Sequence, residues 1–309
     1  MKSKTVTILT SVLVGSLLAT LALAQQPSRV LGPRGLVVNN LEGRAPQTHT
    51  PTTPNLMVYA INIAFEFGAV DLRSGAFLPI GPGLPQNVGN GLVQGPGRSL
   101  LSLGFDGNLI AIDAVTGRTS LVGATGLGDC STPTSPCGPN SAKWIGLFNG
   151  HYYVTDFANN LYSLDPRTAA TKLIGLTGIP AIGFPPFSEN PDGSVNVFGA
   201  SLFSFRGKFY AYFTTLAVNF ANGTVTPLIP GEIYQIDPAT GNATPVAPTE
   251  SFSTIVNVND TIYAFEGLTS QLVILDPTTG LTSPVTSVDP AAAVIAGAAP
   301  AHPAPAAAH

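Results

Sequence analysis

Charged residues are scarce in this chain. Asp, Glu, Lys and Arg make up 10% of the sequence, against about 25% in ordinary soluble domains. Helix surfaces usually carry Glu, Lys and Arg, so their scarcity argues against a mostly helical protein. The formal net charge is −4, with 13 Lys and Arg against 17 Asp and Glu. Because nucleic-acid binding relies on a basic surface that neutralises phosphates, we expect no nucleic-acid partner.

The first 24 residues have the layout of a secretory signal peptide. Lys2 and Lys4 precede an apolar stretch over residues 6–23, and Ala22-Leu23-Ala24 places small residues where signal peptidase cuts. An uncleaved membrane anchor is the alternative, since the apolar stretch is nearly long enough to span a bilayer. The polar residues that follow at once favour cleavage. We therefore expect a secreted or periplasmic protein without a membrane span once the signal is removed.

Cysteine and histidine are also rare, with 2 and 4 copies. Cys130 and Cys137 stand close together, and no histidine or third cysteine lies nearby to complete a zinc site. An even count and a close spacing in an exported chain favour a disulfide that closes this one loop. The sequence also lacks the motifs Gly-x-Ser-x-Gly and His-Glu-x-x-His and any phosphate-binding glycine loop. We assign no catalytic residue and no metal ligand from these patterns.

Turn-forming residues are abundant, with 33 Gly and 28 Pro. Together with frequent Thr, Val, Ile, Tyr and Phe, they indicate short strands joined by tight turns. One pattern recurs five times: an apolar strand that ends in Asp, a turn, and a Thr-rich strand. Asp accepts a backbone N–H two residues later and Gly takes the left-handed conformation, so each copy predicts a hairpin with a type I turn and a bulge. These structural, turn-forming residues are Asp71, Asp113, Asp165, Asp237 and Asp276.

A second hairpin precedes each of the last three copies, so that each unit forms four antiparallel strands. Repeated units of this kind are the signature of propeller blades. The turn aspartates are 42, 52, 72 and 39 residues apart, close to the ~40–50 residues that are usual for a blade. We predict an all-β propeller of five four-stranded blades. The longest interval leaves six blades as an alternative, but residues 178–194 contain too few alternating apolar residues for four more strands.

A propeller closes its ring by combining strands from both chain ends in one blade. Residues 56–61 form a strand of the first blade, and residues 292–297 are its expected partner, with residues 35–38 as the competing candidate. The expected organisation is a signal peptide at 1–24, a Pro-rich linker at 25–54, the propeller at 55–298 and an Ala/Pro-rich flexible tail at 299–309.

One blade resembles a known repeat. Tyr153-Val154-Thr155-Asp156, followed by residues 161–165 and then 172–175, resembles the blade of YVTN-type propeller proteins. That motif has Tyr-Val-Thr-Asn, an apolar strand ending in Asp, and a strand ending in Gly, and in this chain Asp156 replaces the Asn. The other blades match only in the Asp-Pro-x-Thr-Gly hairpin, which is common to many bacterial propellers. The resemblance implies the fold and an extracytoplasmic setting, and no reaction.

Aligning the blades on their tyrosines brings four residues to equivalent positions, three residues after each tyrosine. Equivalent blade positions are arranged around the axis, so these four should form one ring on the face that usually binds ligands. They are Asn62, Asp156, Phe213 and Glu266. Two carboxylates and an amide could bind a sugar or a calcium ion at the axis, or act as an acid/base pair. The alternative is that each polar side chain hydrogen-bonds its own loop, as residues at strand ends often do.

Three functions remain open. The first is a non-catalytic scaffold that binds an extracellular glycan or protein on one face. The second is a glycoside hydrolase or lyase that uses Asp156 and Glu266, and the third is a purely structural surface protein. Scarce charge and scarce histidine favour the first and third, because propeller hydrolases and lyases usually gather several acids, histidines or arginines at the axis. We expect a monomer. The fold cannot decide among the three, since propellers host both binders and enzymes.

Overall fold

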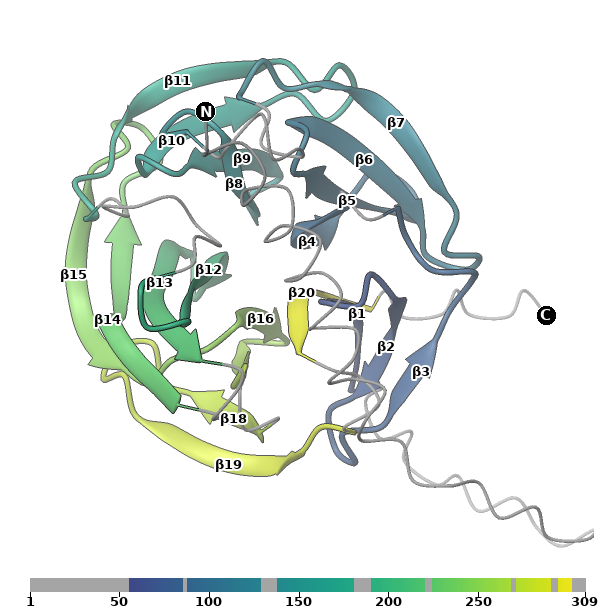
Figure 1. Cartoon of the computed structure of the whole chain (residues 1–309). Coiled ribbons are helices and arrows are strands. Elements are labelled where there is room, and N and C mark those ends of the chain that lie inside the picture. The colour runs from purple at the N-terminus through teal and green to yellow at the C-terminus, as the bar shows by residue number, and fades with distance from the viewer. Residues whose placement is uncertain are drawn as a thin grey trace, which may run out of the picture.

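The protein forms a closed ring of five β-sheets in a computed structural model (Figure 1). The structure describes residues 56–85, 88–128, 138–180, 190–219, 224–267, 271–289 and 294–301. Within these ranges there are 20 β-strands in five four-stranded antiparallel sheets. No helix in them is long and apolar enough to cross a membrane. The predicted five-bladed all-β propeller is confirmed.

Each sheet runs from an innermost strand near the axis to an outermost strand at the rim. In this order the first blade contains β20 (Ile295–Pro300), β1 (Met57–Asn62), β2 (Phe67–Asp71) and β3 (Phe77–Pro79). The second contains β4 (Val88–Gln94), β5 (Ser99–Gly104), β6 (Asn108–Asp113) and β7 (Thr119–Ala124). The third contains β8 (Ala142–Phe148), β9 (His151–Asp156), β10 (Asn160–Leu164) and β11 (Thr171–Leu176).

The last two blades follow the same order. The fourth contains β12 (Val195–Phe205), β13 (Lys208–Asn219), β14 (Thr224–Ile236) and β15 (Ala243–Thr249). The fifth contains β16 (Thr254–Val258), β17 (Thr261–Phe265), β18 (Gln271–Leu275) and β19 (Thr282–Ser287). The five innermost strands contact one another in sequence around the axis.

The ring closes in the first blade, which takes strands from both ends of the described chain. β20 pairs antiparallel with β1, with Tyr59 opposite Ala299 and Ile61 opposite Gly297. The partner strand therefore comes from the C-terminal region, as expected, although it runs from Ile295 to Pro300 and so extends past position 298. The competing segment at residues 35–38 lies outside the described residues.

The Asp turns join the two outer strands of every blade. In the fourth blade, Asp237 Oδ1 accepts a hydrogen bond from the backbone N of Ala239 at 2.9 Å. The N–H of Gly241 donates to the Asp237 carbonyl at 2.8 Å, and Gly241 has a φ of 86°. The equivalent residue in the third blade is Ala169, with a φ of 64°. Bonds of this kind hold the pKa values of Asp113, Asp165, Asp237 and Asp276 below the usual range.

Each Asp turn also contacts the preceding blade, and we call this the rim contact. In Figure 1 the outer strands wrap around the ring, and the end of each reaches the next blade. A Cβ built on Gly117 would lie 2.5 Å from the Ile80 carbonyl oxygen, and one on Gly75 would lie 2.0 Å from that of Ser287. The same contact recurs between the pairs Gly123 and Ala169, Gly175 and Gly241, and Pro248 and Gly280. The repeated turn therefore joins neighbouring blades as well as neighbouring strands.

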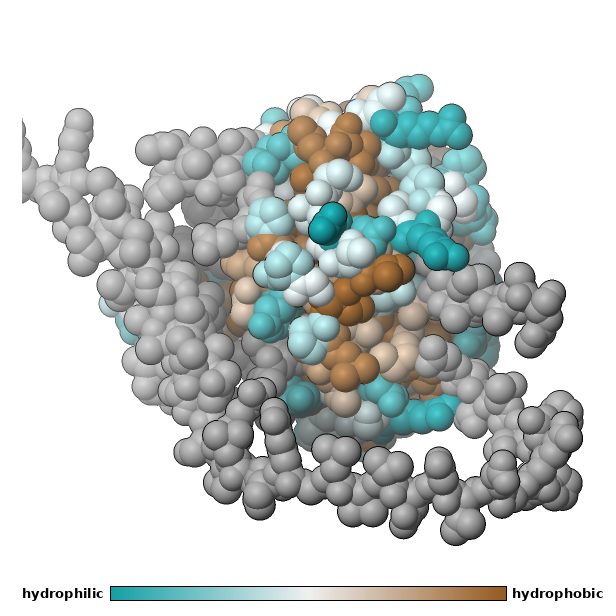
Figure 2. All heavy atoms as spheres, turned by 90° about the vertical axis from the view of Figure 1, so that its right-hand side faces the viewer, coloured by the Kyte–Doolittle hydropathy of each residue, from teal (hydrophilic) through white to brown (hydrophobic). Residues whose placement is uncertain are grey.

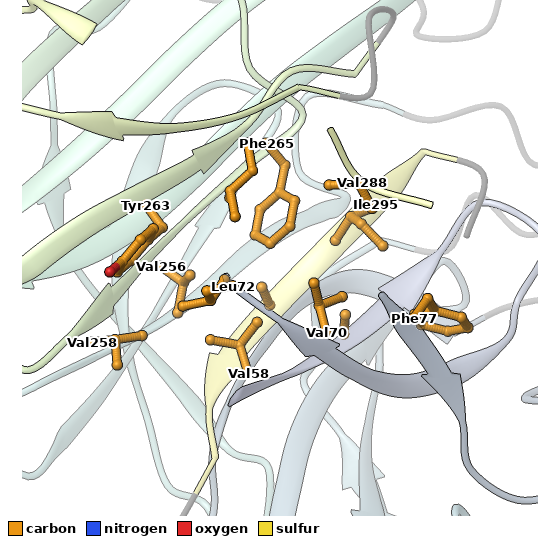
Figure 3. Close-up of a cluster of buried hydrophobic side chains, with 13 residues drawn as sticks. Val58, Val70, Leu72, Phe77, Val256, Val258, Tyr263, Phe265, Val288 and Ile295 are labelled. Atoms are coloured by element: carbon orange, nitrogen blue, oxygen red, sulfur yellow. The ribbon is translucent and has the colours of Figure 1, made fainter. Parts of the chain in front are cut away.

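The hydrophobic core lies mainly between blades. Figure 3 shows one such layer, in which Val58 and Leu72 of the first blade meet Val256 and Phe265 of the fifth. The outer surface of the ring carries apolar patches between polar ones (Figure 2). Leu121 on β7 is one of the exposed apolar residues of the outermost strands. Prolines in the outermost strands β3, β15 and β19 limit pairing of these open edges with another chain.

The fourth blade is larger than the others. Its strands β12, β13 and β14 have 11, 12 and 13 residues, whereas the remaining strands have 3 to 7. Residues 195–199, 214–219 and 224–230 form the part of this sheet that we call the blade-4 extension. The longer strands of this one blade account for part of the long interval between Asp165 and Asp237. The described residues therefore form five sheets rather than six.

Candidate functional site

Asn62 ends β1 and is buried, with 1% of its surface exposed. Its Oδ1 accepts hydrogen bonds from the backbone N of Ala64 at 3.0 Å and of Glu66 at 2.8 Å. Its Nδ2 donates to Glu66 Oε2 at 2.8 Å. The side chain thus holds the loop to β2, in which Phe65 has a φ of 61°.

Asp156 occupies the equivalent place at the end of β9 and is fully buried. Its Oδ1 accepts a hydrogen bond from the backbone N of Asn160 at 2.8 Å. Its Oδ2 accepts two more, from Asn160 Nδ2 at 2.7 Å and from the Tyr162 hydroxyl at 2.9 Å. Burial, reinforced by Asp156, raises the pKa of Tyr162 to about 12. Both carboxylate oxygens of Asp156 are therefore already engaged by its own hairpin.

Phe213 lies in β13, opposite Ala200, and is buried between the third and fourth blades. The Nζ atom of Lys143 stands 3.9 Å from the centroid of its ring. Lys143 belongs to β8, at a point where the pairing with β9 shifts register. Burial lowers the pKa of Lys143 to about 7, against the opposing attraction of Asp156. Lys143 thus brings Phe213 and Asp156 into one cluster across the blade boundary.

Sequence reasoning missed the role of Lys143. The signal that could have found it was a lysine inside an apolar innermost strand, a place where an ammonium group must find internal partners.

Glu266 follows β17 and interacts with a second acid, Glu250. Partial desolvation raises the pKa of Glu250, and the charge of Glu266 and a hydrogen bond between the two carboxyl groups raise it further. Thr282 Oγ1 also donates to Glu250 Oε2, at 3.4 Å. Glu250 lies in the connection between β15 and β16, so this pair spans the fourth and fifth blades.

The four predicted ring residues therefore have different partners. Asn62 and Asp156 stabilise the loops that follow their own strands, which is the alternative that the sequence left open. Asp156 and Phe213 are brought together through Lys143, and Glu266 instead meets Glu250. A ligand at this ring stays a prediction. Within the described part of the chain, no three His, Cys, Asp or Glu side chains gather closely enough to hold a metal ion.

A hollow with a volume of about 670 Å³ lies beside the blade-4 extension. Its wall includes the loop before β12, where Asn190 Nδ2 donates to Asn196 Oδ1 at 2.8 Å and Asn196 Nδ2 donates back at 3.2 Å. Polar groups and a few apolar side chains line it. They are Asn190, Pro191, Asp192, Ser194, Asn196, Ala217, Asn219, Thr224, Thr226 and Leu228. We call this hollow the blade-4 depression.

Asp192 is hydrogen-bonded within the wall of the depression. Its Oδ1 accepts hydrogen bonds from the backbone N of Ser194 at 2.9 Å and from the Ser194 hydroxyl at 2.7 Å. These bonds keep the pKa of Asp192 below its usual range, so the side chain is a carboxylate at neutral pH. Asn219 Nδ2 donates to the Asp192 carbonyl at 3.1 Å and ties the loop to the end of β13.

A smaller hollow of about 320 Å³ lies between the third and fourth blades at their turns. Its lining includes His151, Tyr152 and the prolines Pro166 and Pro238. His151 follows the Asn149-Gly150 turn and is exposed. Cys130 and Cys137 lie outside the described residues, so their disulfide stays a prediction.

No protein-family model matches the chain, and no curated protein matches it. Solved structures with a similar fold include a nidogen/laminin complex, at 10% identity over 79% of this chain and 97% of that chain, with a TM-score of 0.44. The PQQ-bound aldose sugar dehydrogenase of Streptomyces coelicolor is 14% identical over 72% of this chain and 87% of that chain, with a TM-score of 0.41. A putative 6-phosphogluconolactonase of Bacteroides fragilis is 13% identical over 81% of this chain and 99% of that chain, with a TM-score of 0.38. Likenesses this distant carry no argument about function.

Proposed function

We propose that this chain is a non-catalytic propeller scaffold that binds a neutral, hydroxyl-rich ligand of the glycan class in the blade-4 depression. The observation that carries the proposal is the blade-4 extension, in which three consecutive strands are longer than the other strands of the ring. Such an extension is not needed to close the ring, and the depression lies beside it.

The size and the lining of the depression suit a glycan. A volume of about 670 Å³ falls in the ~300–1,000 Å³ range of ligand pockets. Amide and hydroxyl side chains line it, and Asp192 is the charged residue among the described lining residues. Because this charge is negative and no basic side chain joins it among the described lining residues, a neutral ligand with hydroxyl donors is favoured over a phosphate or a carboxylate.

One buried hydroxyl supports the same conclusion. Thr215 lies on the face of β13 that also carries Ala217, because β12 and β13 pair without a register shift along this stretch. Thr215 is 1% exposed, and its Oγ1 has no hydrogen-bond partner within the described residues. A buried hydroxyl without a partner is costly, so a water or a ligand hydroxyl that reached Thr215 would gain a bond.

The signal-peptide pattern and the resemblance of the third blade to YVTN-type repeats support a setting outside the cytoplasm. A secreted or periplasmic location belongs to this proposal. Neutral glycans are abundant on cell surfaces and in extracellular matrices, where such a scaffold would meet them.

A glycan array probed with the wild-type protein and two matched variants tests the proposal. Thr226 is exposed, lines the depression and stands opposite Ala217, so Thr226→Arg should fill the hollow without disturbing the core. Thr244 is an exposed threonine of β15 in the same blade, and Thr244→Arg is the control. We expect neutral glycans to bind the wild type and Thr244→Arg, and a loss of at least tenfold in Thr226→Arg. Equal binding by both variants, or no glycan bound by the wild type, would refute the proposal.

A further inference from the structure

The exposed cationic side chains of the described residues lie on one face of the ring. Strands within each blade are antiparallel, so a hairpin between the first and second strands lies on the same face as the Asp turn between the third and fourth. We call this the turn face. Every exposed Lys and Arg in the described ranges lies in one of these turns or at the start of the strand that follows it. They are Arg73, Arg98, Arg118, Arg167, Lys172, Arg206 and Lys208.

Away from the turn face, the described charges are mostly negative. The lysine described there is Lys143, which is buried and whose Nζ donates a hydrogen bond to Asn159 Oδ1 at 2.5 Å. The carboxylates away from the turn face include those of Glu66, Asp106, Asp156, Asp192, Glu232, Glu250 and Glu266. Because the exposed cations are confined to one face, an anionic polymer is attracted to that face and repelled by the opposite one.

The basic character of the turn face is strongest on the second, third and fourth blades, which are neighbours in the ring (Figure 1). We call this part the basic turn surface. Its exposed cationic residues are Arg98, Arg118, Arg167, Lys172, Arg206 and Lys208. The turn face of the first and fifth blades instead carries Arg73 together with Asp71, Asp260 and Asp276.

The carboxylates described on the basic turn surface are those of the turn residues Asp113, Asp165 and Asp237, and the turns themselves supply their hydrogen bonds. Asp165 Oδ1 accepts a hydrogen bond from the backbone N of Arg167 at 2.9 Å, and its Oδ2 accepts one from the Thr168 hydroxyl at 2.9 Å. The guanidinium group of Arg206 stands 4.8 Å from the centroid of the Phe205 ring, and its side chain is exposed. The cationic groups therefore remain accessible to a ligand.

The smaller hollow, of about 320 Å³, lies within the basic turn surface. The β8–β9 hairpin contributes His151 and Tyr152 to its lining, and the Asp turns of the third and fourth blades contribute Pro166 and Pro238. Pro166 precedes Arg167 directly, so a cationic residue stands at the border of the hollow.

Aromatic packing also holds a second cationic turn against this hollow. The ring of Phe209, at the start of β13, stacks on Phe148 at 5.2 Å and meets Tyr153, a lining residue, at 4.9 Å. These contacts join the β12–β13 hairpin, which carries Arg206 and Lys208, to the β8–β9 hairpin. Cationic residues from both blades therefore surround a hollow that is lined by tyrosines.

The chemistry of this surface selects a class of ligand. Arg presents paired N–H groups that match the two oxygens of a carboxylate. Tyrosine offers an apolar ring and a polar hydroxyl, which suits the apolar face and the hydroxyls of a sugar. A volume of about 320 Å³ is at the lower end of the ~300–1,000 Å³ range of ligand pockets, so a small unit of a longer molecule fits there. The spread of the cations over three blades favours a polymer that repeats its charge.

We propose that the basic turn surface binds an acidic glycan, whose uronic acid carboxylates meet the exposed arginines and lysines and whose sugar ring enters the hollow between the third and fourth blades. Double-stranded nucleic acid carries a charge about every 1.7 Å and would press phosphates against the turn aspartates, whereas a glycan spaces its carboxylates more widely. The blade-4 depression lies on the opposite face, so this inference does not rest on the proposed function.

Isothermal titration calorimetry of the full chain with an oligogalacturonate tests the proposal. The same oligomer with its carboxyl groups methyl-esterified is the neutral control, and a poly-glutamate peptide of equal charge is the control for a bare polyanion. One variant combines Arg167→Gln, Arg206→Gln and Lys208→Gln. Arg73→Gln is its matched control, because the backbone N of Arg73 donates to Asp71 Oδ1 at 2.9 Å, as that of Arg167 does to Asp165.

We expect the wild type to bind the oligogalacturonate, more weakly as salt is added, and not to bind the ester. The triple variant should lose about tenfold in affinity, since exposed charge contacts contribute roughly two- to fivefold each, and Arg73→Gln should stay within about twofold of the wild type. No binding by the wild type, or an equal loss in both variants, would overturn the proposal. So would equal or tighter binding of the poly-glutamate peptide or of a single-stranded oligonucleotide.

One more variant separates this inference from the proposed function. Thr226→Arg fills the blade-4 depression on the opposite face and should leave the affinity for the oligogalacturonate unchanged. A loss in Thr226→Arg as large as in the triple variant would overturn the assignment of the acidic glycan to the turn face. Oligogalacturonate binding by a protein that binds no neutral glycan would leave this inference standing while the proposed function fell.

Discussion

Gly280 and Pro248 meet across the boundary between the fifth and fourth blades, so closely that a Cβ on Gly280 would lie 1.9 Å from the Pro248 carbonyl oxygen. Thr249 Oγ1 donates to the Gly280 carbonyl at 2.9 Å in the same contact. Gly280 also has a φ of 73°, which its place in the Asp turn requires. This glycine therefore serves two purposes, one within its hairpin and one between blades.

A matched pair of alanine variants separates these two purposes. Gly150 has a φ of 77°, and a Cβ built on it meets nothing within 4 Å. We expect Gly150→Ala to cost about 1 kcal/mol, from the left-handed backbone alone. Gly280→Ala should cost about 1–3 kcal/mol more, because the fourth blade must shift to make room. Urea unfolding of both variants measures the difference, and equal losses would mean that the rim contact does not stabilise the ring.

The Asp turns were predictable because their chemistry is local. Each turn is specified within a few residues, as in Asp237-Pro238-Ala239-Thr240-Gly241, and five copies at blade spacing predict the ring. The closing strand could be found for a similar reason, since a propeller needs one strand from the far end of the chain. By contrast, nothing near Lys143 in the sequence announces Phe213 or Asn159, because blade packing brings them together over a long separation.

The blade-4 extension was hidden for a different reason. Pro227 and Pro230 lie within β14, and proline usually argues against a strand because it lacks the N–H that a ladder needs. The structure tolerates them through register shifts next to Thr215 in the pairing of β13 with β14. The depression that these strands border therefore could not be read from local sequence.

Tyr212 holds the start of the fifth blade against the fourth. Its buried hydroxyl accepts a hydrogen bond from the backbone N of Phe252 at 2.6 Å and donates to the Glu250 carbonyl at 3.3 Å. Tyr212→Phe should cost about 1–3 kcal/mol, because it leaves a buried N–H without a partner. Tyr263→Phe is the control, since within the described residues the Tyr263 hydroxyl takes no hydrogen bond. Thermal unfolding compares the two, and a Tyr212 variant as stable as the control would show that this hydroxyl is dispensable.

The Glu250 and Glu266 pair should make the protein less stable as the pH rises. Because the pKa of Glu250 is raised in the folded state, its unfolded form loses the proton at lower pH than its folded form does. The stability that this proton contributes is fully present below the pKa of Glu250 in the unfolded state. It is lost as the pH rises through the pKa of Glu250 in the folded state. Glu250→Gln removes the repulsion and should stabilise the protein at pH 7, by no more than ~0.5 kcal/mol because the side chain is exposed and screened by solvent.

A double-mutant cycle gives this prediction its control. At pH 7, Glu266→Gln should stabilise the protein about as much as Glu250→Gln, because either change removes the same repulsion. The double variant should gain little beyond either single change, since only one repulsion exists to be removed. At pH 4 the gain of either single variant should be smaller than at pH 7, because folded Glu250 keeps its proton to a higher pH than the unfolded form does. Two results would show that Glu250 and Glu266 do not repel each other across the boundary of the fourth and fifth blades. One is a stabilisation that is the same at pH 4 and pH 7, and the other is a double variant whose gain equals the sum of the single gains.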